Sequence, residues 1–224
     1  MSETGEHGPR IGAIVATTNT KSEATKNTKN TKSTKNTKST KTHIGRNKEP
    51  AMPNVERTSS KRHVSKRVAS PVGTLTVVAT DEGLAAILWE HERPHRVRLH
   101  IEAEDARHPV LVEAERQLAE YFSGRRKRFA LKLDVSGTPF QRKVWNALLT
   151  IPFGETRSYA QIAKQIGHPS AMRAVGAANG RNPVSIVAPC HRVVGSNGAL
   201  TGFAGGLEVK ARLLALEGVG SERA

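Results

Sequence analysis

The chain contains a single cysteine, Cys190, and a histidine and an arginine follow it directly. Cysteine attacks as its thiolate, so a reactive one needs a nearby cation, base or helix N-terminus that lowers its pKa. His191 and Arg192 are the candidates for the base or cation that lowers the pKa of Cys190. Adjacent side chains do not normally face one another, so we expect His191 to reach Cys190 through a bound water rather than directly. The competing interpretation is a buried, inert residue, which is the commoner role of a lone cysteine.

A histidine base is usually oriented by a third group, typically a carboxylate. Glu217 is the candidate, because residues 207–216 have the spacing of a helix and Glu217 stands in its last turn. The helix dipole disfavours an anion there by roughly 0.3–1 kcal/mol. A locally unfavourable acid suggests a distant partner, although an exposed side chain is the simpler interpretation. The residues of this helix expected to face the core are Val209, Leu213 and Leu216.

The chain as a whole is basic and contains one cysteine. The 224 residues carry a formal net charge of +15, and residues 1–67 hold 15 of the 35 Lys and Arg but only 5 of the 20 Asp and Glu. A basic balance favours nucleic acid or another anionic partner. One cysteine excludes an internal disulfide and a cysteine-rich zinc site.

No apolar run approaches the roughly 18 residues that a membrane span needs. The one early apolar stretch, residues 11–16, is shorter than the roughly 7–15 residues of a secretory signal core. We therefore expect an intracellular, soluble protein without a membrane partner, in the cytoplasm or, in a eukaryote, the nucleus.

Residues 1–62 are predicted to be a disordered basic tail. Thr-Lys pairs recur every three residues from Thr25 to Thr40, and no apolar residue interrupts them. Such a segment buries too little apolar surface to offset chain entropy. Three interpretations stay open: an arm that adds salt-sensitive DNA affinity, a passive tail, or an artefact of the start site with Met52 as the true start.

Residues 63–136 are predicted to form an α/β half. Alternating β-branched residues and an Asp-Glu-Gly turn indicate a hairpin, and a helical spacing ended by Gly124 follows it. The four basic residues at 125–128 are either a solvated turn or a phosphate contact. The expected elements are strands at 74–78 and 84–89, a helix at 110–121 and a strand at 129–133.

Residues 137–218 are predicted to be mainly helical. Thr138 followed by proline, and Ser158 followed three residues later by glutamine, are typical helix starts. The second of these helices should stop at Gly167, and Ser170 should cap a third that runs to about Ala178. Two short helices joined by a glycine-containing turn indicate a helix-turn-helix. The first helix has an apolar stripe expected to face the core: Phe140, Val144, Trp145, Leu148 and Leu149.

The third helix has unusually small side chains, and Arg173 is its only charged residue. A helix that reads the major groove needs longer polar side chains that reach base edges. A face of small residues instead allows close approach to a surface such as a narrow groove. Tight packing between helices is the alternative explanation.

The segment 189–194, with Asn182 and Pro183 upstream, resembles the active-site segment of the O6-alkylguanine-DNA alkyltransferases, also called methylated-DNA–protein-cysteine methyltransferases. The resemblance is close over residues 137–218, looser over 63–136 and absent from the tail. Five further motifs stand where that family has comparable residues, at 137–141, 154–156, 158–159, 173–176 and 205–207.

The resemblance implies an α+β fold, with a ribonuclease-H-like half at 63–136 and a winged-helix-like DNA-binding half at 137–218. It implies irreversible transfer of an alkyl group from O6-alkylguanine in double-stranded DNA to Cys190, once per molecule, by a monomer. His191 would act through water as the base, and Glu217 would orient it. Tyr159 would donate a proton as the guanine leaves. No cofactor is implied, and we predict no zinc site because the first half offers no cysteine ligand.

The resemblance also assigns the DNA contacts and the pocket. Arg173 would enter the base stack where the damaged nucleotide has swung out, an extrusion that costs a few kcal/mol. Asn182 and Pro189 would support the turn before the cysteine, and Phe203 would lie in the pocket lid. The remaining residues expected at the DNA surface are Ser170, Ala171, Ala174 and Gly176.

Three other functions compete with this one. A non-catalytic binder of alkylated DNA would lack the acceptor cysteine. A cysteine hydrolase would need an oxyanion site, for which no motif is present. A helix-turn-helix regulator would bind undamaged DNA by sequence, and its cysteine would be incidental.

Overall fold

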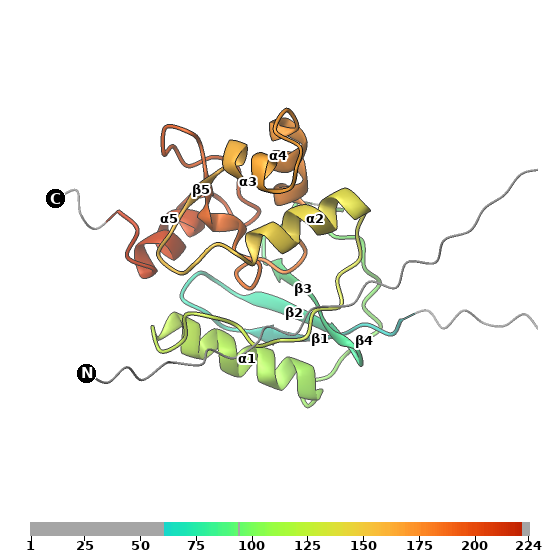
Figure 1. The fold of residues 1–224 in the computed structure, drawn as a ribbon. Coiled ribbons are helices and arrows are strands. Elements are labelled where there is room, and N and C mark those ends of the chain that lie inside the picture. Colours follow the sequence, from blue (N-terminus) through green and yellow to red (C-terminus); the bar gives the residue numbers. More distant parts are fainter. Residues whose placement is uncertain (1–60, 94, 221–224) are drawn as a thin grey trace, which may run out of the picture. The chain divides into compact units, whose positions relative to one another are not determined.

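A four-stranded sheet forms the first half of the protein, in a computed structural model that describes residues 61–93 and 95–220 (Figure 1). The expected hairpin is present, because β2 (Leu75–Thr80) and β3 (Gly83–Trp89) pair antiparallel. β1 (Val64–Val68) pairs antiparallel with β2, and β4 (Ala103–Glu104) joins β1 in parallel. The strand order is β3-β2-β1-β4. The predicted tail lies almost entirely outside the described residues.

Apolar side chains cover both faces of this sheet. α1 (Pro109–Phe122) contributes Leu111 and Leu118 to the cluster that holds Leu75 and Val77. On the other face, a smaller cluster forms around Val78, Ala85 and Ala86. It is covered by residues of the segment that connects β3 to β4, namely Val97, Leu99 and Ile101.

The free edge of β3 pairs first with the end of the first half and then with the second half of the protein. Leu84 exchanges backbone hydrogen bonds of 2.8 Å with residues 132 and 134. Further along the strand, the Ile87 amide donates to the Pro183 carbonyl at 2.8 Å, and Ile87 forms a parallel bridge with Val184. The chain just before Cys190 is therefore fixed to the sheet by main-chain hydrogen bonds.

The predicted strand at 129–133 is wrong. Only Leu133 takes part in the sheet, through an isolated bridge to Leu84. The reason is a side chain on α1: Gln117 accepts from the Ala130 amide at 2.8 Å and donates to the Ala130 carbonyl at 3.1 Å. The side-chain amide thus takes the hydrogen bonds that a neighbouring strand would have made.

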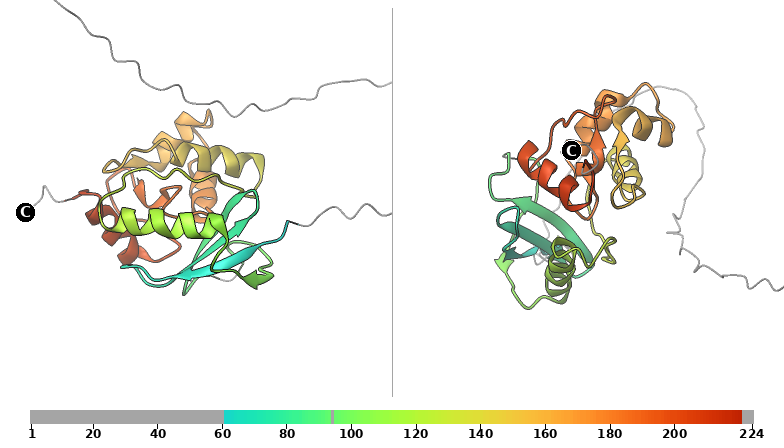
Figure 2. Two further views of the ribbon diagram at one scale, coloured as in Figure 1. Left: turned by 90° about the horizontal axis from the view of Figure 1, so that it is seen from below. Right: turned by 90° about the vertical axis from the view of Figure 1, so that its left-hand side faces the viewer.

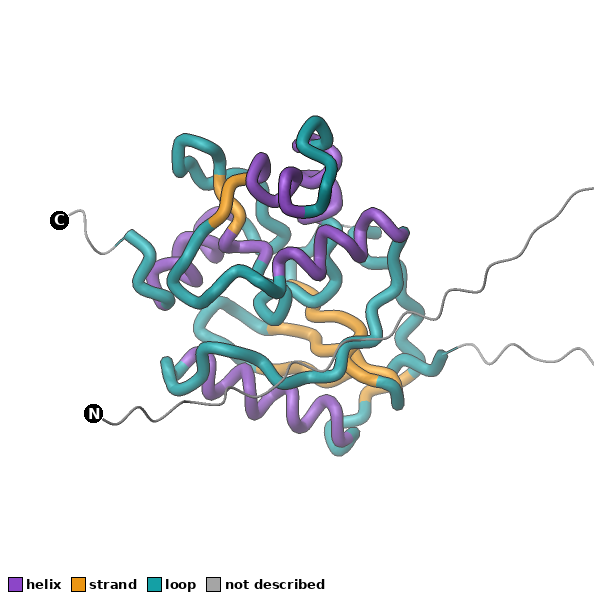
Figure 3. The backbone as a smooth tube through the Cα atoms, viewed as in Figure 1, coloured by secondary structure: helices purple, strands orange, loops and turns teal. Residues whose placement is uncertain are grey.

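The second half consists of helices with very short strands (Figures 1 and 3). α2, α3 and α4 pack against one another, and the strands β5 and β6 pair in parallel. Cys190 lies on a single turn of 3₁₀ helix, η1. The bounds are α2 Pro139–Leu148, β5 Arg157–Ser158, α3 Tyr159–Gln165, α4 Met172–Gly180, η1 Cys190–Arg192, β6 Val193–Val194 and α5 Leu207–Leu216.

Two of the three predicted helix caps are confirmed. Thr138 and Ser158 each form a capping box with the glutamine three residues on. Ser170 does not cap a helix: α4 begins at Met172 after Ala171, with no side-chain cap. The Ala171 amide instead bonds the His168 carbonyl at 2.9 Å, so a turn separates Ser170 from the helix.

Two leucines predicted to face the core are exposed. α2 ends at Leu148, so Leu149 leaves the helical stripe and is 45% exposed. On α5, Leu216 is 37% exposed, whereas Leu213 and Leu214 are buried.

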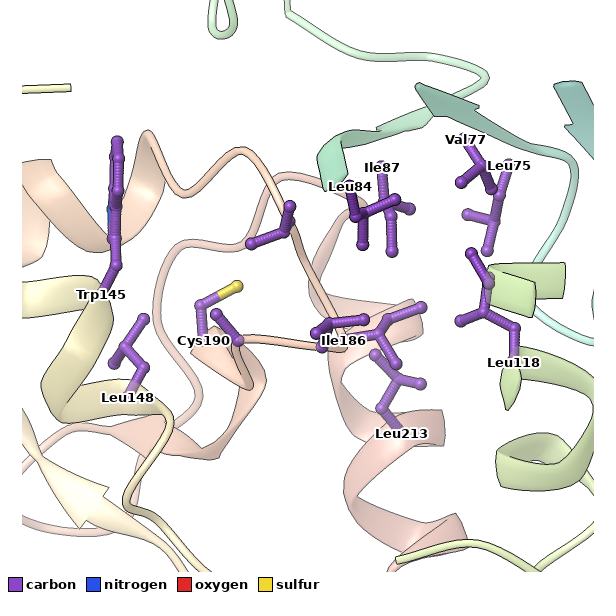
Figure 4. Packing of buried hydrophobic residues seen from close by; sticks show 14 of the residues in the cluster. Leu75, Val77, Leu84, Ile87, Leu118, Trp145, Leu148, Ile186, Cys190 and Leu213 are labelled. Atoms are coloured by element: carbon purple, nitrogen blue, oxygen red, sulfur yellow. The ribbon is translucent and has the colours of Figure 1, made fainter. Parts of the chain in front are cut away.

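One hydrophobic cluster contains residues from both halves of the protein. Figure 2 shows the ribbons of the two halves from two further sides. Cys190 belongs to this cluster and lies between Trp145 and Leu148 on one side and Ile186 and Leu213 on the other (Figure 4). The mixed α+β architecture agrees with the predicted fold class. Within the described residues, no helix is both long and apolar enough to cross a membrane.

Candidate active site

Asn182 forms hydrogen bonds across the turn that precedes Cys190. The buried Asn182 side chain accepts from the Val184 amide at 3.1 Å and donates to the Ala188 carbonyl at 2.7 Å. Within the turn, Ile186 is fully buried and has a φ of 74°, a backbone conformation that costs a β-branched residue energy. Pro189 then precedes η1 as its N-cap. Tertiary contacts, rather than local preference, therefore fix the backbone before the cysteine.

Cys190 is a buried, protonated thiol in this structure. It is 2% exposed, and its sulfur lies 3.8 Å from the Ser185 hydroxyl. Burial raises the pKa of Cys190 more than hydrogen bonds from Asn182 and Ser185 and the charges of Arg96 and Lys210 lower it. The expectation of a lowered pKa is therefore wrong for the resting protein, because desolvation exceeds the effect of the nearby cations.

His191 and Glu217 form a buried pair next to the cysteine. His191 Nε2 lies 2.8 Å from Glu217 Oε1, and both side chains have no exposed surface. Burial lowers the pKa of His191, so the imidazole is neutral, and we assign its proton to Nε2, which faces the carboxylate. His191 Nδ1 is then an acceptor, and it has no hydrogen-bond partner among the described residues. The pair therefore offers a free, oriented base.

The Glu217 carboxylate remains ionised because several hydrogen-bond donors bind it. Burial by itself would raise the pKa of Glu217, but hydrogen bonds from His191 and Arg192 lower it to about 2. Arg192 donates to both carboxylate oxygens, at 2.7 and 2.9 Å, and to the Ile151 carbonyl at 2.6 Å. The Tyr121 hydroxyl donates at 2.6 Å. The interpretation of Glu217 as an exposed side chain is therefore wrong.

Two residues of this network differ from the sequence-based expectations. Arg192, a candidate cation for the cysteine, points to Glu217 instead. His191 and Arg192, which follow Cys190 on η1, both contact Glu217 Oε1. Tyr121 belongs to the core-facing stripe of α1, and its hydroxyl gave no signal in the sequence.

Lys210, which the sequence analysis missed, is a fully buried cation on α5. Its Nζ donates to the Val193 carbonyl at 2.5 Å and to the Thr201 carbonyl at 2.8 Å. Burial lowers the pKa of Lys210 to about 8. The lysine thus ties β6, which follows the cysteine, to the loop that carries Phe203.

Arg96, which the sequence analysis also missed, is a residue of the first half that contacts the active-site turn. Its side chain is 5% exposed and donates to the main-chain carbonyl of Asn182 and, at 3.3 Å, to that of Ile87. Glu92 pairs with it at 2.6 Å. A charge-assisted contact therefore links the segment after β3 to the turn that carries Cys190.

A cavity of about 940 Å³ lies beside α4. Tyr159, Arg173, Gly176 and Phe203 line it, whereas Ser170, Ala171 and Ala174 do not. The remaining lining residues are Arg93, His95, Arg96, Ala160, Met172, Ala177, Gly180, Arg181, Gly195, Ser196, Asn197, Thr201, Gly202 and Ala204.

Phe203 links the cavity to the buried pair. Its ring lies edge-on to the His191 ring at 6.4 Å and to the Trp89 ring at 5.4 Å, measured between centroids. The Tyr159 hydroxyl accepts a 3.2 Å hydrogen bond from Thr201, two residues before Phe203. Cys190 and His191 are not among the described residues that line the cavity.

The small residues of α4 do not all pack inside the protein. Ala178 is buried, but Ala174 and Ala177 are not, and Arg173 is exposed. The packing explanation accounts for only part of this helix, and an accessible face of short side chains remains. The described residues contain no group of three or more His, Cys, Asp and Glu that could hold a metal ion.

Two family models match the two halves of the chain. Residues 65–135 match the ribonuclease-like domain of 6-O-methylguanine DNA methyltransferase, and residues 139–219 match its DNA-binding domain. A methylated-DNA–protein-cysteine methyltransferase of Methanosarcina acetivorans is 49% identical over 152 residues, which cover 66% of this chain and 94% of that protein. The constitutive enzyme of that name from Bacillus subtilis is 60% identical over 110 residues, which cover 49% of this chain and 67% of that protein.

A solved structure agrees with the sequence comparisons. The crystal structure of Mycobacterium tuberculosis OGT in complex with DNA superposes with a TM-score of 0.63 at 45% identity, covering 70% of this chain and 92% of that one. Both halves of the described chain thus have counterparts in known proteins. The chain belongs to the 6-O-methylguanine DNA methyltransferase family.

Proposed function

We propose that the protein repairs DNA directly, by irreversible transfer of the alkyl group of O6-alkylguanine in double-stranded DNA to Cys190. The Cys190–His191–Glu217 arrangement carries this proposal, because a neutral, oriented imidazole with a free Nδ1 follows directly after the acceptor thiol. The Cys190 sulfur bonds to the alkyl carbon as the bond from that carbon to O6 breaks. A thioether is stable, and with one cysteine in the chain no second thiol can resolve it.

His191 receives the thiol proton through a bridging water. Burial favours the protonated thiol at rest, so we propose that this transfer accompanies the attack. The imidazolium that forms is stabilised by the Glu217 carboxylate. Hydrogen bonds from Arg192 and Tyr121 orient this carboxylate. Tyr159 donates a proton to the departing guanine, and solvent returns the proton from His191 to Tyr159.

The cavity beside α4 receives the extruded nucleotide. An alkyl carbon on O6 is inaccessible inside the base stack, so the base has to leave the duplex before the sulfur can reach it. Arg173 is exposed at the cavity and fills the place left in the stack. The short side chains Ala174 and Ala177 allow α4 to approach a narrow minor groove.

The remaining assignments follow from the same proposal. Residues 63–136 and 137–218 are the two domains, and the protein acts as a monomer without a cofactor. Asn182 and Pro189 support the turn, and Phe203 covers the pocket. The reaction takes place where the DNA is, in the cytoplasm of a prokaryotic cell or the nucleus of a eukaryotic one.

Mass spectrometry after incubation with a duplex that contains O6-methylguanine tests the proposal. The peptide with Cys190 should gain about 14 Da, the mass of one methylene group, because a covalent acceptor keeps what it captures. Cys190→Ala should bind the duplex but gain no mass. A methyl group on any other residue, or transfer by Cys190→Ala, would contradict the proposal.

A further inference from the structure

The cavity beside α4 is lined by cations from both halves of the protein and by no acid. The segment after β3 contributes the cations Arg93 and Arg96, and α4 and its C-cap contribute Arg173 and Arg181. No aspartate or glutamate is among the described residues that line it. A concave surface with one sign of charge focuses its potential and attracts a polyanion.

Two of these cations already have a role. Arg96 is nearly buried. Its guanidinium group pairs with Glu92 and donates to the carbonyls of Ile87 and Asn182. Arg173 is assigned to the base stack. Arg93 and Arg181 remain: neither is buried, and neither forms an ion pair with a carboxylate within the described part of the chain.

The backbone of Arg93 is held in place by the residues around it. Glu92 accepts from the Trp89 amide at 3.2 Å and pairs with Arg96 at 2.6 Å. The Arg96 amide bonds the Arg93 carbonyl at 3.3 Å. The Arg96 side chain in turn binds the carbonyl of Asn182 in the active-site turn. The sheet half of the protein thus presents Arg93 at the cavity, beside residues that contact the active-site turn.

A nucleotide that swings into a cavity brings its two flanking phosphates to the opening. Guanidinium groups bind phosphate with two parallel hydrogen bonds, and such contacts fix the position of a protein on DNA. On the basis of the proposed function, we infer that Arg93 and Arg181 bind phosphodiester groups of the alkylated strand next to the extruded nucleotide. The ribonuclease-like half then takes a direct part in DNA binding, together with the helical half.

The salt dependence of binding tests this inference, with Arg93→Gln, Arg181→Gln and the double variant in the full-length chain. The slope of log Kobs against log salt falls by about 0.9 for each phosphate that the protein no longer neutralises. We expect this decrease for each single variant and about twice as much for the double variant, on duplex with O6-methylguanine. Arg98→Gln is the control, because Arg98 lies on the same segment and is not buried but does not line the cavity.

Neutral methylphosphonate groups beside the lesion locate the contact. Replacing the phosphates on either side of O6-methylguanine should weaken binding by the wild-type protein about as much as the double substitution does. The double variant should lose little further affinity on the neutralised DNA. Arg93→Lys should retain most of the salt slope, because it retains the charge.

Transfer from the free O6-alkylguanine base separates this inference from the proposed function. In Arg93→Gln and Arg181→Gln the loss of affinity for the duplex should exceed any loss of rate on the free base, because the base carries no phosphate. An unchanged salt slope in Arg93→Gln, or an equal decrease in Arg98→Gln, would overturn the role of Arg93. Failure of the wild type to accept an alkyl group at all would instead refute the proposed function.

Discussion

At the scale of single residues, the site has an acceptor whose environment opposes its ionisation. Burial favours the neutral thiol of Cys190 and also the neutral imidazole of His191. Neither group is charged before the reaction, and the stable charge pair beside them is that of Glu217 with Arg192. Burial thus disfavours the thiolate in the resting protein.

The first prediction concerns the buried charge of Glu217. Glu217→Gln leaves Arg192 uncompensated, and breaking a buried pair in this way costs about 3–5 kcal/mol of unfolding free energy. Transfer from the free base should slow by roughly 10²-fold, because the imidazole loses its orientation. Urea unfolding and single-turnover kinetics measure the two effects.

Glu208→Gln is the matched control for this change. Glu208 lies on the same helix and pairs with Arg212 at 2.7 Å, but both side chains are exposed. Exposed pairs contribute little to stability, so both stability and rate should stay near the wild-type values. Equal effects of the two substitutions would show that the Glu217 network has no special role.

The second prediction concerns the acid side of the stability profile. Folded His191 resists protonation, so the unfolded chain binds more protons below pH 6.5 and the unfolding free energy falls as the pH falls. Glu217 adds a second loss between pH 4.5 and about pH 2, since its folded pKa lies below its unfolded value. Urea unfolding at a series of pH values measures both. His191→Asn should flatten the profile from pH 6.5 to 4.5, and an unchanged slope there would contradict this account.

The residues of the site could be predicted only where the sequence places them in a recognisable segment. Cys190, His191 and Asn182 stand in one short stretch, and Glu217 stood out as an acid at an unfavourable helix end. Arg96, Lys210 and Tyr121 could not be found in this way, because each acts from another element on a main-chain carbonyl or on the Glu217 carboxylate. Such contacts exist only after the chain has folded.

At the scale of elements, the loop that carries Thr201 and Phe203 is held from two sides. Lys210 on α5 binds the Thr201 carbonyl, and the Trp89 ring of β3 packs against Phe203. A Cβ atom on Gly205 would lie 2.8 Å from the Trp89 ring, so glycine is needed there for the close approach. The loop over the pocket is thus fitted to a side chain of the sheet half.

The third prediction tests this fit. Gly205→Ala should lower the unfolding free energy by about 1–3 kcal/mol, because the rigid indole cannot move away easily. It should also slow transfer from both the free base and the duplex, because Phe203 moves with the loop. Thermal unfolding and single-turnover assays provide the measurements. Gly202→Ala in the same loop should leave stability unchanged, since its Cβ would meet nothing within 4 Å.

Local sequence signals predicted the elements well where the hydrogen bonds of the backbone are made by residues close in sequence. The hairpin and the capped starts of α2 and α3 depend on residues within a few positions of one another. The strand at 129–133 and the cap at Ser170 failed, because the distant Gln117 takes the strand's hydrogen bonds and a turn displaces the start of α4. Both errors arise where a competing hydrogen bond was not visible in the local pattern.

At the scale of the whole molecule, the two halves share one core and one site. The edge of β3 binds the segment before Cys190, Tyr121 of α1 binds Glu217, and Arg96 binds Asn182. The sheet half therefore positions the reacting residues, while α3 and α4 carry the surface proposed to meet DNA. Chemistry and DNA binding should be separable by substitution.

The fourth prediction uses this separation. Arg173→Ala should slow transfer from duplex DNA by at least about tenfold, since the duplex then lacks the side chain that holds the extruded state. It should leave transfer from the free base unchanged, because the exposed Arg173 side chain is not part of the hydrogen-bond network around Cys190. Parallel single-turnover assays on the two substrates decide the matter, with Arg98→Ala as the control. Equal slowing on both substrates would remove Arg173 from the extrusion step.

The stoichiometry of transfer tests the central claim most directly. Wild-type protein is incubated with a large excess of duplex that contains O6-methylguanine, and repaired guanine is counted against protein by quantitative mass spectrometry. We predict a plateau at one methyl group per chain, with every transferred methyl on the Cys190 peptide. Continued repair beyond one equivalent, or a free Cys190 thiol after the repaired duplex has been released, would contradict the account.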